Sequence, residues 1–230
     1  MSPYILITCH YYSGLAVKRQ VSYTYELPNL ECGSLMILPL SSSSIVTAAS
    51  TLNNGGVVVL PTDTVYGLAA HPGKPASVAR LYTIKGREAG KPIALLAADP
   101  GAVERFGAEF PSVAQKLAER YWPGALTLVL PCGETFEGFR VPAHEGACEL
   151  LAACGGVLRV TSANLSGEMP ALSAVAALKE FGLEADLVLD DGVSPGGVPS
   201  TVVKVTKEGV LTVLREGAIS SNDIFGCVGG

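Results

Sequence analysis

Short apolar runs alternate with amphipathic stretches from about residue 44 onward, and this alternation predicts a sheet with helices packed against it. The predicted strands are Val57–Leu60, Ile93–Leu96, Ala125–Leu130, Phe139–Val141, Val157–Val160, Leu187–Leu189, Val202–Val205 and Val210–Leu214. The predicted helices are Ser44–Leu52, Pro75–Lys85, Asp99–Phe106, Ser112–Tyr121, Cys148–Cys154 and Ser173–Phe181. Because the late strands crowd together across a hairpin turn, the pattern favours an α/β (α+β) fold with one twisted, mixed sheet and flanking helices.

The periodic part of the chain predicts one domain over residues 44–220, which contain no internal repeat and no linker. Residues 1–43 have no sustained periodicity and end in a run of serines, so we assign them as an N-terminal extension of unknown role. Residues 221–230 are assigned as a C-terminal tail.

Composition narrows the class of protein. The six cysteines have no C-x-x-C spacing, which disfavours a zinc site or a disulfide framework. No apolar run approaches the roughly 18 residues that a membrane span needs. We therefore expect a cytoplasmic protein with free thiols and no membrane contact. The net charge of −5 also disfavours a generic binder of polyanions.

Hydrogen-bonding side chains, most of them hydroxyls, gather at the ends of several predicted strands. They are Thr62, Asp63, Thr64 and Tyr66 after one strand, Thr161, Ser162 and Asn164 after a second, and Ser200 and Thr201 before a third. Each group alone is typical of a turn. Because open α/β sheets bind ligands beyond the carboxyl ends of their strands, several such groups in one domain favour a shared pocket for a small polar ligand.

Basic side chains gather around two glycines in residues 80–91, beside the single acid Glu88. They are Arg80, Lys85, Arg87 and Lys91. A helix C-terminus favours cations by roughly 0.3–1 kcal/mol, which accounts for Lys85 but not for Arg87 and Lys91. Cations in a glycine-containing loop also suit a phosphate chain, and both interpretations stay open at this point.

Several familiar catalytic signatures are missing from the sequence. The segment Gly86-Arg87-Glu88-Ala89-Gly90-Lys91 has one residue too few between its glycines for a P-loop, and no G-x-G-x-x-G occurs. The three histidines have no metal-ligand spacing, and no nucleophile–base pair is visible. The sequence therefore predicts neither a metal site nor a covalent mechanism.

Seven segments occur in the order in which one family has them. They are PTDTVYGL (61–68), ARLYTIKGREAGKPI (79–93), WPGALTLVL (122–130), RVPAH (140–144), TSANLSG (161–167), PSTVV (199–203) and LREGAI (214–219). On these motifs the chain resembles the YrdC-like family of L-threonylcarbamoyladenylate synthases, in the short form with a single catalytic domain. The resemblance covers the predicted domain and implies a twisted α/β sheet with a deep concave pocket.

The resemblance also implies an activity. L-threonine, bicarbonate and ATP would be joined into threonylcarbamoyl-AMP with release of pyrophosphate, for the threonylcarbamoyladenosine modification of tRNA next to the anticodon. The protein would then be a nucleotidyltransferase that uses Mg²⁺ with its ATP. It would pass its product to a tRNA-modifying threonylcarbamoyl transferase. The resemblance is also compatible with a weak contact between this protein and tRNA.

Individual side chains take their roles from the same resemblance. It implies threonine contacts from Thr62, Thr64, Tyr66, Arg140 and Ser200. It implies ATP contacts from Lys85, Arg87, Lys91, Ser162, Asn164 and Arg215, of which Lys85 and Arg87 are the catalytic candidates. Three places depart from the residues more common in the family, namely Arg159-Val160-Thr161, Ala171 and Glu216.

Other functions stay open beside this one. A YrdC-like RNA-binding module would use a basic concave surface, although a net charge of −5 weighs against strong affinity for RNA. A paralogue with a different acceptor would carry the same motifs. A carbamoyl-adenylate former of the hydrogenase-maturation type is disfavoured, because the cysteine-rich zinc motifs of that type are missing.

Overall fold

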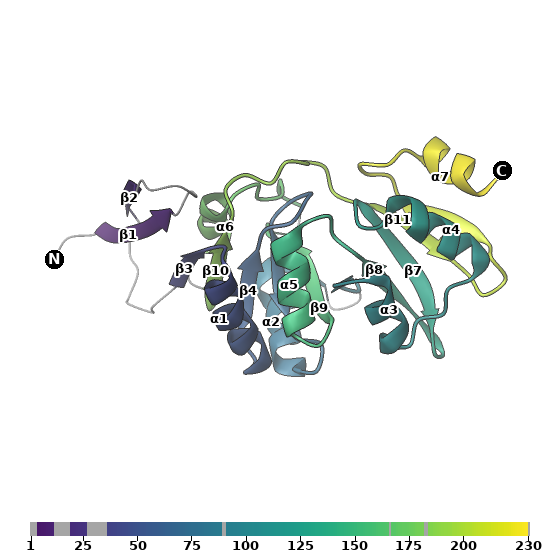
Figure 1. Ribbon diagram of the computed structural model, residues 1–230, viewed down its shortest axis with the longest axis horizontal. Helices are drawn as coiled ribbons and strands as arrows, with labels where there is room; N and C mark the ends of the chain where they lie inside the picture. Colours follow the sequence, from purple (N-terminus) through teal and green to yellow (C-terminus); the bar gives the residue numbers. More distant parts are fainter. Residues whose placement is uncertain are drawn as a thin grey trace.

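A computed structural model of the 230-residue chain describes residues 4–11, 19–26, 36–88, 91–165, 167–181 and 184–229. It contains a main sheet of ten strands and a separate antiparallel pair, β1 (Tyr4–Tyr11) with β2 (Arg19–Glu26) (Figure 1). The pair lies beside one end of the main sheet, and the last helix lies at the other end.

The main sheet is mixed, as the sequence predicts. Its strands are β3 (Met36–Pro39), β4 (Val57–Leu60), β5 (Gly67–Ala70), β6 (Leu95–Ala97), β7 (Leu126–Cys132), β8 (Thr135–Arg140), β9 (Val157–Ser162), β10 (Leu187–Asp190), β11 (Thr201–Val205) and β12 (Leu211–Arg215). Their order is β12-β11-β7-β8-β6-β9-β5-β4-β10-β3. Strands β4, β10 and β3 run parallel, whereas β4, β5 and β9 alternate in direction. The predicted fold class is thereby confirmed.

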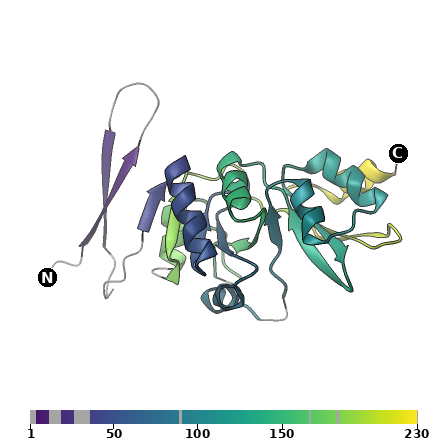
Figure 2. The same ribbon diagram turned by 60° about the horizontal axis from the view of Figure 1, so that its bottom comes forward.

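Helices cover the β4 half of the sheet on both faces. The helices are α1 (Ser42–Asn53), α2 (Pro75–Lys85), α3 (Pro100–Phe106), α4 (Ser112–Tyr121), α5 (Glu145–Ala153), α6 (Ala174–Phe181) and α7 (Ser221–Val228). Val58 and Leu60 of β4 pack in a cluster with α1 and α5, and Val57 and Val59 pack in a cluster with α2 and α6. Figure 2 shows α1 and α5 on one side and α2 on the other. Burial on both faces explains why this strand is apolar throughout.

The β7 half of the sheet has helices on one face and a cavity on the other. Leu126, Leu128 and Leu130 of β7 are fully buried in a cluster with α3, α4 and α7. Thr127 and Val129 point to the opposite face, where they line a cavity. Because side chains alternate along a strand, one strand both builds the core and forms a wall of the site.

The domain extends beyond residues 44–220 at both ends. Strand β3 lies in the segment assigned as an extension, yet it pairs with β10 in the main sheet. Helix α7 lies in the segment assigned as a tail, and its Ile224 is fully buried in the core. Both elements lie in segments without sustained periodicity, and they become regular through pairing with β10 and packing against α4.

The first helix begins earlier than predicted. Helix α1 starts at Ser42, because Ser41 and Ser44 form a reciprocal capping box at its N-terminus. None of the helices in the described ranges is long and apolar enough to cross a membrane.

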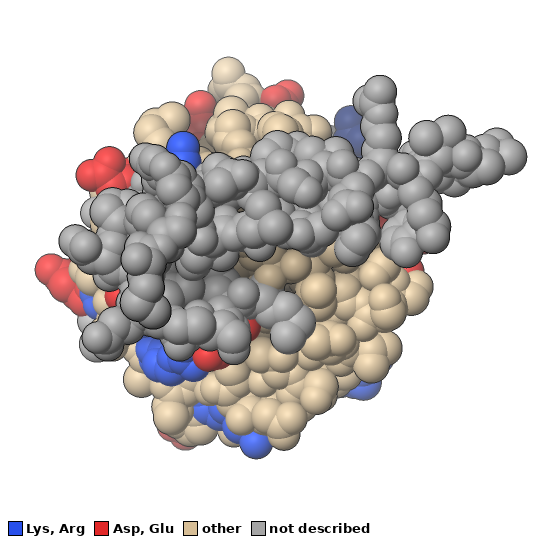
Figure 3. Space-filling view, turned by 90° about the vertical axis from the view of Figure 1, so that its left-hand side faces the viewer, with Lys and Arg blue, Asp and Glu red and all other residues tan. Residues whose placement is uncertain are grey.

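At the β3 end of the molecule, Figure 3 shows basic, acidic and uncharged side chains interspersed on the part of that face that is not grey.

An ion pair braces the sheet across its shortest main-sheet strand. Strand β6 holds 3 residues and lies between β8 and β9. Arg159 of β9 donates to both carboxylate oxygens of Glu137 of β8, at 2.6 and 2.8 Å, and to the Ile93 carbonyl at 2.8 Å. The hydrogen bonds to Glu137 raise the pKa of Arg159. Arg159 is one of the departures from the family pattern, and Glu137 supplies its reason.

Removing β3 should destabilise the domain. A chain that begins at Ser44 loses the Leu38 and Leu40 side chains from the α1 cluster and the Ser41 cap. We expect its free energy of unfolding to fall by about 2–4 kcal/mol relative to a chain that begins at Met36. Urea denaturation of both proteins measures the difference, and equal midpoints would show that β3 contributes nothing.

Candidate active site

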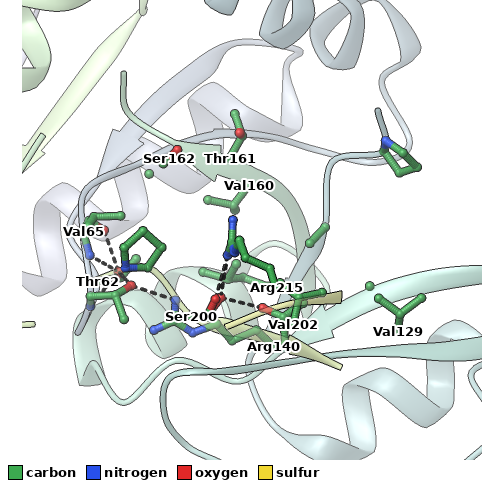
Figure 4. A pocket seen from close by; sticks show the side chains of 18 of the residues that line it. Thr62, Val65, Val129, Arg140, Val160, Thr161, Ser162, Ser200, Val202 and Arg215 are labelled. Atoms are coloured by element: carbon green, nitrogen blue, oxygen red, sulfur yellow. Dashed lines mark hydrogen bonds between the residues drawn. The ribbon is translucent and has the colours of Figure 1, made fainter. Parts of the chain in front are cut away.

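A cavity of about 470 Å³ opens on the uncovered face of β7, β8 and β11. The loop between β4 and β5 and the end of β9 close its other side. In Figure 4, Thr62, Arg140 and Ser200 lie together on one side, Val129 on the other, and Thr161 and Ser162 above. The volume is in the range of sites for small ligands. The sheet thus brings together residues from all seven motifs found in the sequence.

The Thr62 hydroxyl is used within the protein. It donates to the Val65 carbonyl at 2.6 Å and accepts from the backbone N–H groups of Thr64 and Val65 at 3.2 and 3.3 Å. The Thr64 hydroxyl lies 3.2 Å from it. A hydroxyl has one donor and two acceptor sites, so these contacts use its full capacity. Thr62 therefore shapes the β4–β5 turn on the cavity wall.

Arg140 is held by three acceptors. Its Nε donates to the Gly124 carbonyl at 2.9 Å, Nη1 to the Thr64 hydroxyl at 2.7 Å, and Nη2 to Asp63 Oδ1 at 2.6 Å. Its side chain is only 7% exposed, and burial lowers its pKa. A guanidinium has five N–H donors, so two remain for a ligand. Arg140 lines the cavity with its direction fixed.

Ser200 and Arg215 form a second polar group on the wall. The Ser200 hydroxyl lies 2.8 Å from the Thr127 hydroxyl, and Arg215 donates to the Ser200 carbonyl at 2.7 Å. Burial lowers the pKa of Arg215, with smaller contributions from the nearby charges of Arg140 and Arg87. Three arginines thus share one cavity in an acidic protein, and this arrangement suits a ligand with several negative charges.

Lys85 lies next to the cavity, beside Ser162. Its ammonium contacts four oxygens, namely the carbonyl and hydroxyl of Ser162 at 2.5 and 3.4 Å, and the carbonyl and Oδ1 of Asn164 at 2.7 and 3.2 Å. An ammonium has three N–H donors, so a phosphate oxygen must replace at least one of these acceptors. Burial, with a smaller contribution from Arg87, lowers the pKa of Lys85 to about 8.

The other predicted ATP contacts differ in position. Arg87 lines the cavity and donates to the carbonyls of Lys91 and Pro92 at 3.1 and 2.9 Å. Asn164 is buried, and its amide nitrogen donates to the carbonyls of Leu165 and Glu168. Lys91 does not line the cavity: its ammonium lies 3.6 Å from Glu88 and its side chain is 64% exposed.

Tyr66 contributes to the wall, but its hydroxyl points to another loop. It donates to the Gly192 carbonyl at 2.8 Å and accepts from the Asp191 N–H at 3.1 Å. Burial and the nearby aspartates raise its pKa, so it stays neutral. Tyr66 therefore anchors the loop after β10 to the β4–β5 turn, and threonine would meet its other atoms.

Three residues that the sequence did not single out as contacts belong to the site. Thr127 pairs with Ser200, and Asp63 pairs with Arg140. Thr161 lines the cavity, is buried, and has no side-chain hydrogen bond to the described residues. Thr127 had a visible signal, because it is a lone polar residue in the apolar run of β7. Asp63 stood out in the sequence only as part of the polar cluster after β4, because its pairing with Arg140 joins residues far apart in the chain.

A family model for the Sua5/YciO/YrdC proteins, which carries the description "Telomere recombination", matches residues 50–217. The chain belongs to this family. The match includes every residue assigned to the cavity above, and the family fold explains why the motifs converge on one cavity.

Relatives within the Sua5/YciO/YrdC family agree with this placement. The chain is 34% identical over 192 residues to the threonylcarbamoyl-AMP synthase of Pyrococcus abyssi, which covers 79% of this chain and 56% of the relative. It is 32% identical over 203 residues to the Bacillus subtilis enzyme of that name, with 84% and 58% covered. The chain therefore spans less than two thirds of these two relatives. An Alkalilimnicola ehrlichii synthase is 38% identical over 160 residues, with 65% and 82% covered.

Solved structures of the family have the same fold. P. abyssi Sua5 complexed with L-threonine superposes with a TM-score of 0.77 and 32% identity, over 85% of this chain and 60% of that chain. E. coli YciO superposes with a TM-score of 0.74 over 84% of this chain and all of that one. At 24% identity the second comparison supports the fold alone.

Removing the Thr62 hydroxyl should cost stability before it costs binding. In a Thr62→Val protein the Val65 carbonyl and two N–H groups lose their partner, so we expect the free energy of unfolding to fall by about 1–3 kcal/mol. The matched control is Thr161→Val, which removes a hydroxyl without a described protein partner and should stay within about 0.5 kcal/mol. Urea denaturation compares them, and similar losses in both would contradict the turn role.

Proposed function

We propose that this chain makes L-threonylcarbamoyladenylate from L-threonine, bicarbonate and ATP, with release of pyrophosphate, as a step toward threonylcarbamoyladenosine in tRNA. The observation that carries the proposal is the single cavity that Arg87, Arg140 and Arg215 line beside a group of small hydroxyls. Relatives that match most of the chain are named threonylcarbamoyl-AMP synthases, which supports the same reaction.

Threonine would bind between Arg140 and the cluster of hydroxyl side chains in the cavity. The two remaining N–H donors of Arg140 suit the threonine carboxylate. The hydroxyls of Thr161, Thr127 and Ser200 line the same cavity and suit the amino and hydroxyl groups. A Sua5 structure complexed with L-threonine has the same fold, which supports threonine as the amino acid.

The triphosphate would lie against Arg87, Arg215 and Lys85, with Ser162 and Asn164 close by. Two of these cations line the cavity, and Lys85 reaches it through Ser162. Among the described residues, no group of three or more His, Cys, Asp or Glu could hold a metal ion. A Mg²⁺ ion would therefore arrive on the phosphates and help to neutralise them.

The proposed chemistry needs positioning more than protein nucleophiles. The neutral threonine amine attacks carbon dioxide with loss of a proton, or bicarbonate with loss of water, to give a carbamate. A carbamate oxygen then attacks the α-phosphorus of ATP, and pyrophosphate leaves. The arginines would hold two anions in line and stabilise the charge that develops on the phosphates. A separate transferase would consume the product, and we place the reaction in the cytoplasm.

The main alternative is a module that binds RNA, or a paralogue with another acceptor. Affinity for RNA comes largely from neutralised phosphates. Three arginines, Arg87, Arg140 and Arg215, line the cavity, whereas charges of both signs are mixed on the face in Figure 3. A cavity of about 470 Å³ suits a nucleotide and an amino acid better than a polymer.

The reaction itself is the test of the proposed function. Pyrophosphate release should require ATP, L-threonine and bicarbonate together, and should fall to background when any one is left out. Valine, which lacks the hydroxyl, should react at least about 100-fold more slowly, because the polar groups around it would be left unpaired. A comparable rate with valine, or without any amino acid, would count against the proposal. Coupled phosphate detection measures each rate.

Lys85 should make ATP affinity depend on pH. Its pKa is lowered to about 8 in the free protein, and bound phosphates favour the ammonium form, so its pKa rises on binding. Binding therefore takes up a proton above about pH 8, and affinity falls with rising pH by up to about tenfold per pH unit.

Calorimetric titration of ATP in two buffers with different ionisation enthalpies measures this proton uptake. The control is Lys85→Arg, which keeps its charge throughout the range and should show no uptake from this position. Equal proton uptake in the two proteins would show that Lys85 does not contact the phosphates.

A further inference from the structure

The direction of the Arg140 guanidinium depends on a carboxylate that does not line the cavity. Asp63 Oδ1 accepts from Arg140 Nη2 at 2.6 Å, and the two side chains are 14% and 7% exposed. Thr62, Thr64 and Val65, its neighbours in the turn, line the cavity, whereas Asp63 lies behind Arg140. Asp63 therefore acts on a ligand only through the arginine.

The backbone at Asp63 is fixed from two sides. The Thr62 hydroxyl holds the turn that contains it. On the other side, a Cβ at Gly196 would lie 2.6 Å from the Asp63 carbonyl, so only glycine lets the loop after β10 pack this closely. The Gly197 N–H also donates to the Thr64 carbonyl at 2.9 Å. The carboxylate is thus presented to Arg140 by a rigid turn.

The three contacts of Arg140 differ in what they can do. The Gly124 carbonyl and the Thr64 hydroxyl are neutral acceptors, and Asp63 is the anionic one. All three bonds are assisted by the charge of the guanidinium, but Asp63 alone adds the attraction of a full opposite charge, so it has the largest influence on the orientation of the guanidinium plane. It also offsets the desolvation that lowers the pKa of Arg140.

We propose that Asp63 is a positioning residue that aims the two remaining N–H donors of Arg140 into the cavity and thereby sets the affinity for the amino-acid carboxylate. The inference rests on the proposed function, since it takes threonine as the ligand of Arg140. Asp63 acts on the amino-acid end of the cavity, and the ATP contacts of Arg87, Lys85 and Arg215 do not depend on it.

The test compares Asp63→Ala and Asp63→Asn with wild type. In Asp63→Ala, KM for threonine should rise by about tenfold or more, the scale of one charge-assisted hydrogen bond, while KM for ATP changes less than about twofold and kcat at saturating threonine is largely kept. Asparagine keeps an acceptor oxygen without the charge, so Asp63→Asn should lie between wild type and alanine. Calorimetric titration of threonine should follow the same order.

The matched control is Glu137→Gln, which removes the carboxylate of another arginine pair, this one half-buried, at 2.6 Å from Arg159. It should lower stability without raising the ratio of the two KM values. If Asp63→Ala does not fold, Asp63→Asn decides. Equal increases in both KM values, or an unchanged KM for threonine in Asp63→Asn and Asp63→Ala, would overturn the proposal. Wild type that ignores threonine would overturn the proposed function first, and this inference with it.

Discussion

Burying the guanidinium of Arg140 is the constraint on which the site depends. A charge at this depth costs several kcal/mol unless its donors find partners. The partners come from two loops, Gly124 before β7 and Asp63 with Thr64 after β4. The β4–β5 turn must therefore have one shape, which Thr62 imposes from within and Gly196 allows from outside. The contacts that fix the β4–β5 turn therefore also fix the direction of Arg140 in the site.

Periodicity predicted the elements whose own sequences show an apolar run or an amphipathic pattern. Val57–Leu60 is apolar on both faces because both faces are covered, and Ser112–Tyr121 is an amphipathic helix with the predicted bounds. Strand β5 was not predicted. Its sequence, Gly67-Leu68-Ala69-Ala70, has small residues and little intrinsic preference for a strand, and its extended form comes from pairing with β4 on one side and β9 on the other.

The motifs located the cavity better than they described its chemistry. Arg140, Ser200 and Arg215 line it, as the resemblance implies. The roles of hydroxyls could not be read from a motif, because a hydroxyl that binds a ligand and one that closes a turn look the same in sequence. Thr62 closes a turn, and Thr161 faces the cavity without a described partner. The pairing of Asp63 with Arg140 became visible only when the fold brought β8 next to the turn that carries Asp63.

The Arg159–Glu137 pair has a consequence for how such chains diverge. Because β6 has only 3 residues, few backbone hydrogen bonds hold the sheet together between β8 and β9. The Arg159–Glu137 ion pair adds a direct contact between these two strands. Loss of either partner alone would leave a half-buried charge without its counterion. The two positions should therefore change together among homologues, with a small residue at one accompanied by an uncharged residue at the other. An alignment of close relatives would then show positions 137 and 159 as a covarying pair.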